Sequence, residues 1–221
     1  NYERGERDGV FRKWMQNGQL IVEYNYKDGN LYGLSKVWYD NGQLKEERNY
    51  KDGKYNGLSK TWYENGQLEW EGNYKGDRLE GLRQMWDDNG QLRYADNYKN
   101  GRDGLSKEWY ENGQLKTEGT WKRSRRDGVF RKWMQNGQLE WEANYKDDNF
   151  YGLYQEYHEN GQLKVEGTLK GKWNKWDGLY RDWMQNGWLY NEHNYKDGNL
   201  HGLTKSYRFG DGSLAQEIIY E

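Results

Sequence analysis

Apolar, aromatic and turn-forming residues recur along this chain in a pattern that repeats about every 24 residues. One repeat contains two strand-like runs, Leu-Ser-Lys-Thr-Trp-Tyr at residues 58–63 and Leu-Glu-Trp-Glu-Gly-Asn-Tyr at residues 68–74. Asn65-Gly66 lies between them and is typical of a two-residue type I′ turn, in which both residues have positive φ. A Lys-Asp-Gly sequence follows most repeats and predicts a second turn. Each repeat is therefore predicted to be a β-hairpin.

Two glycine columns keep this spacing along the whole chain. A glycine every 10–12 residues and the lack of a 3.6-residue period exclude helix, and no proline interrupts a strand. We predict an all-β fold, an elongated single-layer twisted array of about nine hairpin repeats, with residues 1–221 as one array without separate domains. Residues 1–8 form the second half of a truncated repeat, and the nine repeats begin near residues 9, 33, 57, 81, 104, 128, 152, 178 and 202.

A two-residue turn at the Asn-Gly sequence fixes the predicted strand register. The predicted cross-strand pairs are Lys60–Glu71, Trp62–Glu69 and Tyr63–Leu68 in the third repeat, and Arg12–Glu23, Lys36–Glu47, Lys107–Glu118, Arg131–Glu142 and Arg181–Glu192 elsewhere. In the fourth repeat Gln84 faces Ala95, so both charges are missing together. In the seventh repeat Gln155 faces Glu166. Such pairs mainly fix register, since each contributes only about 0.2–1 kcal/mol.

This register sorts the side chains onto two faces. One face is predicted to carry the Lys/Arg–Glu pairs and an aromatic column, which we interpret as structural: Trp14, Trp38, Trp62, Trp86, Trp109, Trp133, Tyr157, Trp183 and Tyr207. The alternative is a stacking platform for sugars or quaternary ammonium groups. The other face is predicted to carry a leucine column, a mostly tyrosine column, and variable positions between them.

Composition removes several functional classes. The 221 residues have a formal net charge of -2, which provides no field to attract nucleic acid or an anionic membrane. No apolar run is long enough to span a bilayer as a helix, so no transmembrane segment is predicted. There is no cysteine, hence no disulfide or thiol chemistry. The 13 Trp and 21 Tyr argue against disorder.

The sequence contains no catalytic constellation. Its three histidines lack metal-ligand spacing, and we interpret them as surface or aromatic-column substitutions. No nucleophile elbow, phosphate-binding loop or dinucleotide fingerprint is present. We expect a protein that is not an enzyme and that needs no cofactor and no metal.

At these residues the repeat resembles a known family. The order Trp-Tyr-Glu-Asn-Gly-Gln-Leu-Glu-Trp-Glu-Gly-Asn-Tyr, residues 62–74, is similar to the bacterial variant of the MORN repeat found in YwqK-type antitoxin proteins. The resemblance implies a hairpin array that serves as a scaffold for binding other proteins. Some relatives look like antitoxins or immunity proteins for secreted toxins.

We therefore expect a non-enzymatic protein-binding scaffold whose partner is another protein, with edge-to-edge self-association as a further possibility. Two alternatives remain open: a surface or secreted structural or adhesive array, and a binder of carbohydrates or membrane surfaces through the aromatic residues. Residues 1–5 resemble the end of a repeat and no methionine starts the chain. We expect residue 1 to be a boundary in a longer or processed polypeptide, and the compartment, cytoplasmic or exported, stays open.

Large aromatic residues at the variable positions are the predicted binding residues, because tyrosine and tryptophan anchor protein interfaces most often. Glu46, Thr117 and Val165 occupy the same central column, so the fold does not require an aromatic residue there. The alternative is that these rings cover the leucine column from water. The predicted binding residues are Tyr39, Tyr63, Trp70, Tyr94, Tyr110 and Trp141.

This interpretation predicts that replacing Trp70 and Trp141 together by alanine leaves unfolding cooperative and abolishes partner binding. Thermal unfolding and the affinity for an identified partner measure the two effects. Loss of folding, or an unchanged affinity, would show that the two rings are structural or irrelevant to binding.

Overall fold

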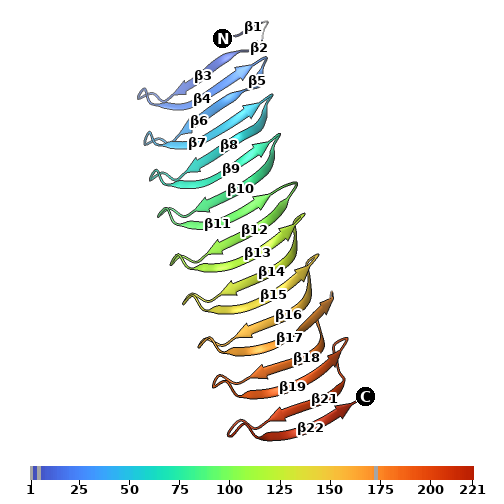
Figure 1. Cartoon of the computed structure of the whole chain (residues 1–221). Coiled ribbons are helices and arrows are strands. Elements are labelled where there is room, and N and C mark those ends of the chain that lie inside the picture. The colour runs from blue at the N-terminus through green and yellow to red at the C-terminus, as the bar shows by residue number, and fades with distance from the viewer. Residues whose placement is uncertain (1, 4–5, 172–173) are drawn as a thin grey trace. The chain divides into compact units, whose positions relative to one another are not determined.

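The computed structural model describes residues 2–3, 6–171 and 174–221, with only the backbone of residues 2 and 3. The described chain consists of strands and turns, which confirms the predicted all-β array of hairpins (Figure 1). It forms two compact units, unit 1 at Asn1–Gly104 and unit 2 at Leu105–Glu221. The strand β12 (Arg102–Trp109) contains the boundary between them.

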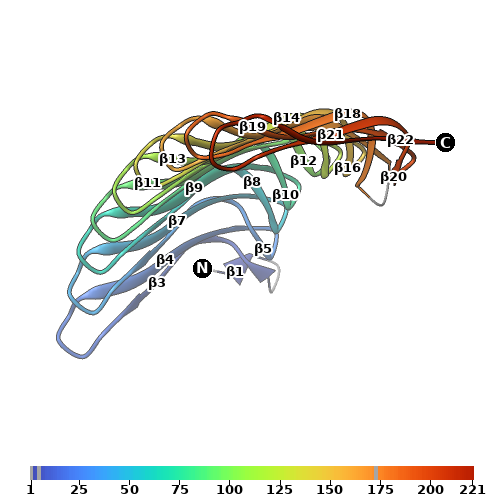
Figure 2. The same ribbon diagram turned by 90° about the horizontal axis from the view of Figure 1, so that it is seen from below.

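In unit 1, the strands from β3 to β11 pair antiparallel with their neighbours in sequence and form an open, single-layer sheet (Figure 2). The short strands β1 and β2 pair with each other. The strands are β1 (Tyr2–Glu3), β2 (Glu6–Arg7), β3 (Gly9–Trp14), β4 (Leu20–Lys27), β5 (Asn30–Leu31), β6 (Gly33–Trp38), β7 (Leu44–Lys51), β8 (Lys54–Trp62), β9 (Leu68–Lys75), β10 (Arg78–Trp86) and β11 (Leu92–Tyr98).

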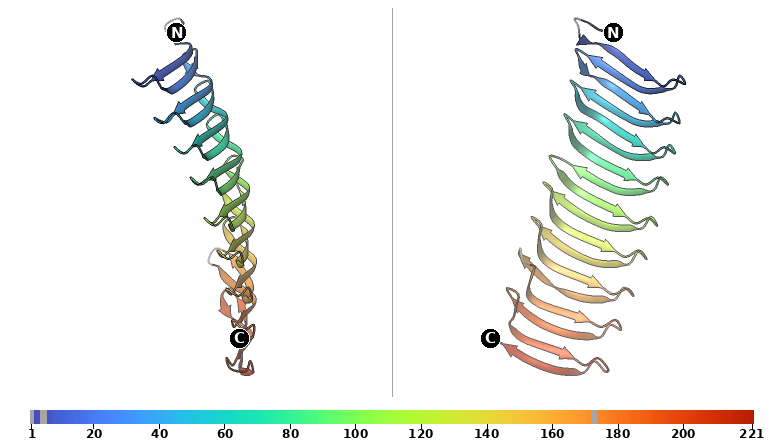
Figure 3. Two further views of the ribbon diagram at one scale, coloured as in Figure 1. Left: turned by 90° about the vertical axis from the view of Figure 1, so that its left-hand side faces the viewer. Right: turned by 180° about the vertical axis from the view of Figure 1, so that it is seen from behind.

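Unit 2 repeats this arrangement from β13 to β22, again as a single antiparallel layer (Figure 3). Its strands are β13 (Leu115–Lys122), β14 (Arg125–Trp133), β15 (Leu139–Lys146), β16 (Asn149–Tyr157), β17 (Leu163–Gly171), β18 (Lys175–Trp183), β19 (Leu189–Lys196), β20 (Asn199–Leu200), β21 (Gly202–Tyr207) and β22 (Leu214–Tyr220).

The predicted register is confirmed in the middle of each hairpin. All six predicted pairs of a cation with a glutamate are present, with nitrogen–oxygen distances of 3.2 Å for Lys60–Glu71 and 2.9 Å for Lys107–Glu118. The two departures from the charge pattern are confirmed as well: Gln84 lies opposite Ala95, and Gln155 donates a hydrogen bond to Glu166.

The turn at Asn65-Gly66 differs from the predicted type I′ turn. Only Gly66 has a positive φ, of 84°, and its N–H donates to the carbonyl of Tyr63 at 2.9 Å. The Tyr63 N–H in turn donates to the Gln67 carbonyl. This is a three-residue loop, a type I turn followed by a left-handed glycine, and it has one more residue than the predicted turn.

The longer loop also shifts the register at the turn end. Trp62 pairs with Leu68, and Glu69 becomes the extra residue of a β-bulge. The predicted pairs Trp62–Glu69 and Tyr63–Leu68 are therefore wrong. Because directly paired residues share a face, the leucine column lies on the tryptophan face and not, as predicted, with the tyrosines.

Type I′ geometry occurs instead at the turns between repeats. Asp28 and Gly29 both have positive φ, 47° and 77°, and Lys27 pairs with Asn30 across this two-residue turn. The chain thus places its tighter turn at Asp-Gly and its looser one at Asn-Gly, although both dipeptides tolerate left-handed conformations.

Side chains at several Asn-Gly turns form hydrogen bonds to the next hairpin. Tyr39 donates from its hydroxyl to the carbonyl of Trp62 at 2.6 Å, and Asn41 donates to the carbonyl of Glu64 at 2.8 Å. In unit 2 the imidazole of His158 takes the place of such a tyrosine and lies 2.8 Å from the carbonyl oxygen of Trp183. These bonds stack the turns on top of one another along the edge of each unit.

The buried side chains lie mainly on the tyrosine face, while the tryptophan column is half-buried, and Trp14 is exposed. The core of unit 2 contains Phe130, Ala143 and Tyr145, packed against partly buried aromatic rings. Large and small residues alternate there across neighbouring strands. A Cβ atom built on Gly119 would lie 2.1 Å from the ring of Phe130, so the ring occupies the space of the absent side chain.

This packing predicts that Gly119→Ala lowers the free energy of unfolding by about 1–3 kcal/mol, because the added methyl group collides with the ring. Phe130→Leu in the same chain should recover part of the loss, since a smaller side chain frees the space. Chemical denaturation of both single variants and the double variant measures the coupling. Strictly additive effects would contradict the proposed contact.

Candidate functional site

A row of five side chains crosses the tyrosine face of unit 1. Direct cross-strand pairing orders them as Glu46 on β7, Thr61 on β8, Trp70 on β9, Met85 on β10 and Tyr94 on β11. Adjacent members of the row lie on strands about 4.8 Å apart. The row places two of the predicted binding residues, Trp70 and Tyr94, on either side of Met85.

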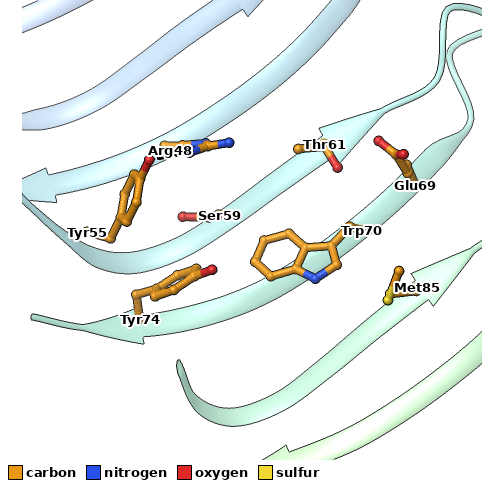
Figure 4. Close-up of a pocket in the computed structure, with 8 residues that line it drawn as sticks. All are labelled: Arg48, Tyr55, Ser59, Thr61, Glu69, Trp70, Tyr74 and Met85. Atoms are coloured by element: carbon orange, nitrogen blue, oxygen red, sulfur yellow. Dashed lines mark hydrogen bonds between the residues drawn. The ribbon is translucent and has the colours of Figure 1, made fainter. Parts of the chain in front are cut away.

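An open cavity of about 280 Å³ lies along this row. Figure 4 shows Ser59 beside Arg48, with Thr61 and Trp70 between Ser59 and Glu69. The aromatic rings of Tyr55 and Tyr74 lie at one end, whereas Glu69 and Met85 lie at the other. The lining residues are Arg48, Tyr55, Ser59, Thr61, Glu69, Trp70, Tyr74 and Met85.

The cavity exists because two of the smallest residues face each other. Ser59 pairs with Gly72 across the hairpin, so no large side chain fills the centre of the sheet face at this point. A Cβ atom on Gly72 would lie 2.9 Å from the ring of Trp70 and 3.0 Å from Leu79, so the indole occupies the space above Gly72 and forms a wall of the cavity. The β-bulge at Glu69 lets two consecutive residues, Glu69 and Trp70, line the same cavity.

The charges around the cavity are unevenly paired. Arg48 forms an ion pair with Glu46 at 2.7 Å and donates a hydrogen bond to the hydroxyl of Tyr55. Its guanidinium also lies 5.0 Å from the centre of the Tyr55 ring. Among the described residues, no lysine, arginine or histidine nitrogen is within ion-pair distance of Glu69. One carboxylate at the cavity therefore lacks a counter-charge.

The floor of the cavity contains a polar atom without a partner. Ser59 is 2% exposed, and its Oγ has no hydrogen-bond partner in the structure. A buried hydroxyl without a partner costs about 1–3 kcal/mol, so a ligand that hydrogen-bonds to it recovers free energy. The combination of aromatic walls, an uncompensated carboxylate and an unpaired hydroxyl suits a ligand that carries both an apolar stem and hydrogen-bond donors.

A family model, described as MORN repeat variant, matches the chain at residues 7–28, 31–52, 55–75, 79–100, 102–123 and 150–170. These segments cover more than half of the sequence. The chain belongs to the MORN repeat variant family. No curated protein matches it.

The MORN repeat variant model leaves some segments of the chain unmatched, but the hairpin fold continues through them. The hairpin of β14 and β15 lies outside the matched segments but keeps the same pairing as its neighbours, with Arg131 opposite Glu142. As a MORN repeat protein, the chain is a repeat scaffold. No helix in the described part of the chain could cross a bilayer.

The six predicted binding residues have different environments. Trp70 and Tyr94 lie on the row described above, and Tyr94 is 39% exposed. Tyr39, Tyr63 and Tyr110 each donate a hydroxyl hydrogen bond to a tryptophan carbonyl of the next hairpin, so they also have a role in stacking. Trp141 belongs to unit 2, where it packs against the aromatic core.

Sequence reasoning missed the residues that shape the cavity, Ser59, Gly72, Arg48 and Glu69. Small residues produce a cavity by the space they leave empty, whereas the predicted binding residues are all large aromatic ones. A signal was present nevertheless. The confirmed register sets Ser59 opposite Gly72, and two small residues facing each other in a face otherwise filled with aromatic residues indicate a hollow.

Tyrosine hydroxyls on this face are held in their neutral form. Burial raises the pKa of Tyr74 and of Tyr145 above the ordinary value of 10.0, although a neighbouring arginine lowers each pKa in part. Burial, and then the negative charge of Glu156, raises the pKa of Tyr154 as well. The folded state therefore binds these protons more tightly than the unfolded chain does.

The sign of these shifts predicts alkaline destabilisation. A raised folded-state pKa contributes stability that is complete below the unfolded value of about 10 and is lost as the pH rises above it. We expect the melting temperature to fall between about pH 10 and pH 12, and to fall less in Tyr154→Phe. Calorimetry together with tyrosinate absorbance tests this. A melting temperature independent of pH in this range would contradict it.

Proposed function

We propose that the chain is a non-enzymatic scaffold that binds another protein through the tyrosine face of unit 1. The observation that carries the proposal is a difference between the two units. In unit 2 the same face is filled by aromatic rings in sequential contact, for example Phe130–Tyr145 at 5.1 Å and Tyr145–Phe150 at 4.4 Å between ring centres. In unit 1 rings also touch, as in Tyr55–Tyr74 at 5.3 Å, but the face contains a cavity beside them and the exposed ring of Tyr94.

The repeated positions are already used within the fold. The cation–glutamate pairs fix the register, and the turn tyrosines and asparagines join neighbouring hairpins. The side chains along the row differ from repeat to repeat on an unchanged backbone, which is the property that lets a repeat array present a specific surface. An antitoxin- or immunity-like role is the finer form of this proposal, supported by the resemblance of the repeats to those of YwqK-type antitoxins.

The test starts from a protein captured with the purified chain from the cells that encode it, then expressed separately and titrated by calorimetry. We expect a defined stoichiometry and a Kd of about 1 µM or tighter. The double variant Trp70→Ala with Tyr94→Ala should weaken binding about 100-fold, since buried aromatic anchors dominate interfaces. Leu179→Ala is a matched control, because it removes an exposed side chain from unit 2.

If the captured protein binds the double variant with unchanged affinity, the tyrosine face of unit 1 is not the binding surface. Binding to lipid vesicles without any protein partner would favour a membrane surface instead. If the partner arrests growth when expressed alone and the chain restores growth, the antitoxin form is supported. A harmless partner argues against that form and leaves the scaffold role intact.

A further inference from the structure

The tetrapeptide Leu-Glu-Trp-Glu occurs twice, at residues 68–71 in unit 1 and at residues 139–142 in unit 2. Both copies take the same place in a hairpin. Trp70 pairs with Thr61, and Trp141 pairs with Lys132, each just before the bulge at the turn end. The two sites therefore have the same backbone register and differ in the residue opposite the tryptophan.

That residue decides whether the glutamate before the tryptophan has a counter-charge. In unit 2, Lys132 donates from Nζ to Glu140 at 2.6 Å. Two other hairpins of unit 2 hold the same pair with the charges exchanged, Lys116–Glu108 and Lys164–Glu156, both also at 2.6 Å. In unit 1 the lysine is replaced by Thr61, and Glu69 has no cation within ion-pair distance among the described residues.

With Thr61 in place of a lysine, Glu69 has no ion-pair partner in the described part of the chain, and a space lies beside it. The cavity begins where a lysine at residue 61 would lie, and about 280 Å³ is below the size of typical pockets for whole small molecules. It suits one long side chain. The ring of Trp70 forms one wall, Glu69 and Met85 line the same end, and the buried hydroxyl of Ser59, beside Arg48, has no hydrogen-bond partner in the residues that the structure describes.

The charges around the cavity favour a cation over an anion. The arginine that lines it, Arg48, is already paired with Glu46 and hydrogen-bonded to Tyr55. Glu69 adds one negative charge with no cation within ion-pair distance among the described residues, and its field contributes to the raised pKa of Tyr39 and of Tyr63, after burial in both cases. An incoming carboxylate would be repelled by Glu69, and Arg48 is already paired.

We propose that this cavity takes a lysine or arginine side chain of a partner protein, which supplies to Glu69 the positive charge that Lys132 supplies to Glu140 within unit 2. The aliphatic stem packs on the indole of Trp70, and the charged end pairs with Glu69. Ion pairing beside an aromatic face strengthens both contacts when water is excluded. The inference rests on the proposed function, because the cation comes from a bound protein.

The test uses a small probe, the peptide acetyl-Gly-Ser-Arg-Ser-Gly-amide, and the indole N–H signals of the full chain in nuclear magnetic resonance spectra. Trp70→Phe and Trp141→Phe assign the two relevant signals among the 13 tryptophans. We expect a saturable shift of the Trp70 signal with the arginine peptide and with its lysine counterpart. The same peptide with citrulline, which is neutral and has nearly the same shape, should bind at least about tenfold more weakly.

Four variants locate the interaction. Glu69→Gln should weaken binding at least about tenfold, whereas Glu64→Gln, in the exposed turn of the same hairpin, should not change it. Thr61→Lys fills the site from within and should abolish the shift at Trp70. Lys132→Thr should create a second site, reported by the Trp141 signal. Thermal unfolding of each variant establishes that it is folded.

Equal binding of the arginine and citrulline peptides, or binding unaffected by Glu69→Gln, would overturn the proposal. So would a chain that ignores the peptides but binds phosphatidylcholine vesicles in a Glu69-dependent way, since the cation would then be a lipid headgroup. With a partner in hand, the two proposals separate. If the double variant Trp70→Ala with Tyr94→Ala lowers the affinity for the partner but Glu69→Gln and Thr61→Lys do not, the scaffold role is supported and the cation site is contradicted.

Discussion

A single layer of β-sheet has no second layer to cover it, and this constraint governs the whole molecule. Each hairpin can bury its side chains only against the hairpins before and after it. The turn bonds follow from this need, because Tyr39 and Asn41 reach forward to carbonyls of the next hairpin. The aromatic contacts follow from it too, since a continuous series of ring contacts in unit 2 runs from Trp121 to Tyr180.

The same constraint explains how a cavity becomes a feature of one repeat. In a layered protein the opposite layer fills a gap, but here only the adjacent repeats can do so. Ser59 and Gly72 are both small, and the neighbouring Arg48 is held by Glu46 and Tyr55 instead of extending over the gap. The hollow that results is bordered by side chains that differ from repeat to repeat.

Much of the fold could be predicted from the sequence, because the period and the charge pairs are local signals. The predicted central register, with Lys60 opposite Glu71, is correct because the bulge at Glu69 offsets the extra loop residue. The turn type could not be read in the same way, since Asn-Gly and Asp-Gly both permit positive φ and the choice depends on stacking against the next turn. That one extra loop residue moved Leu68 to the tryptophan face. For the candidate site, large residues led to Trp70 and Tyr94, whereas the uncompensated charge of Glu69 required knowledge of what lies opposite it.

The fit between Gly119 and Phe130 has a consequence for how such an array can change its length. A repeat is not a free-standing module, because the shape of one hairpin is matched to the hairpin that follows it. Duplicating a block of several repeats preserves every internal match and creates only one new junction. Inserting a single repeat also creates one new junction, but the inserted segment then brings with it no internal junction between matched repeats. Duplication of a block, which the identical segments 7–20 and 126–139 indicate, therefore lengthens the chain with a smaller proportion of mismatched contacts between repeats.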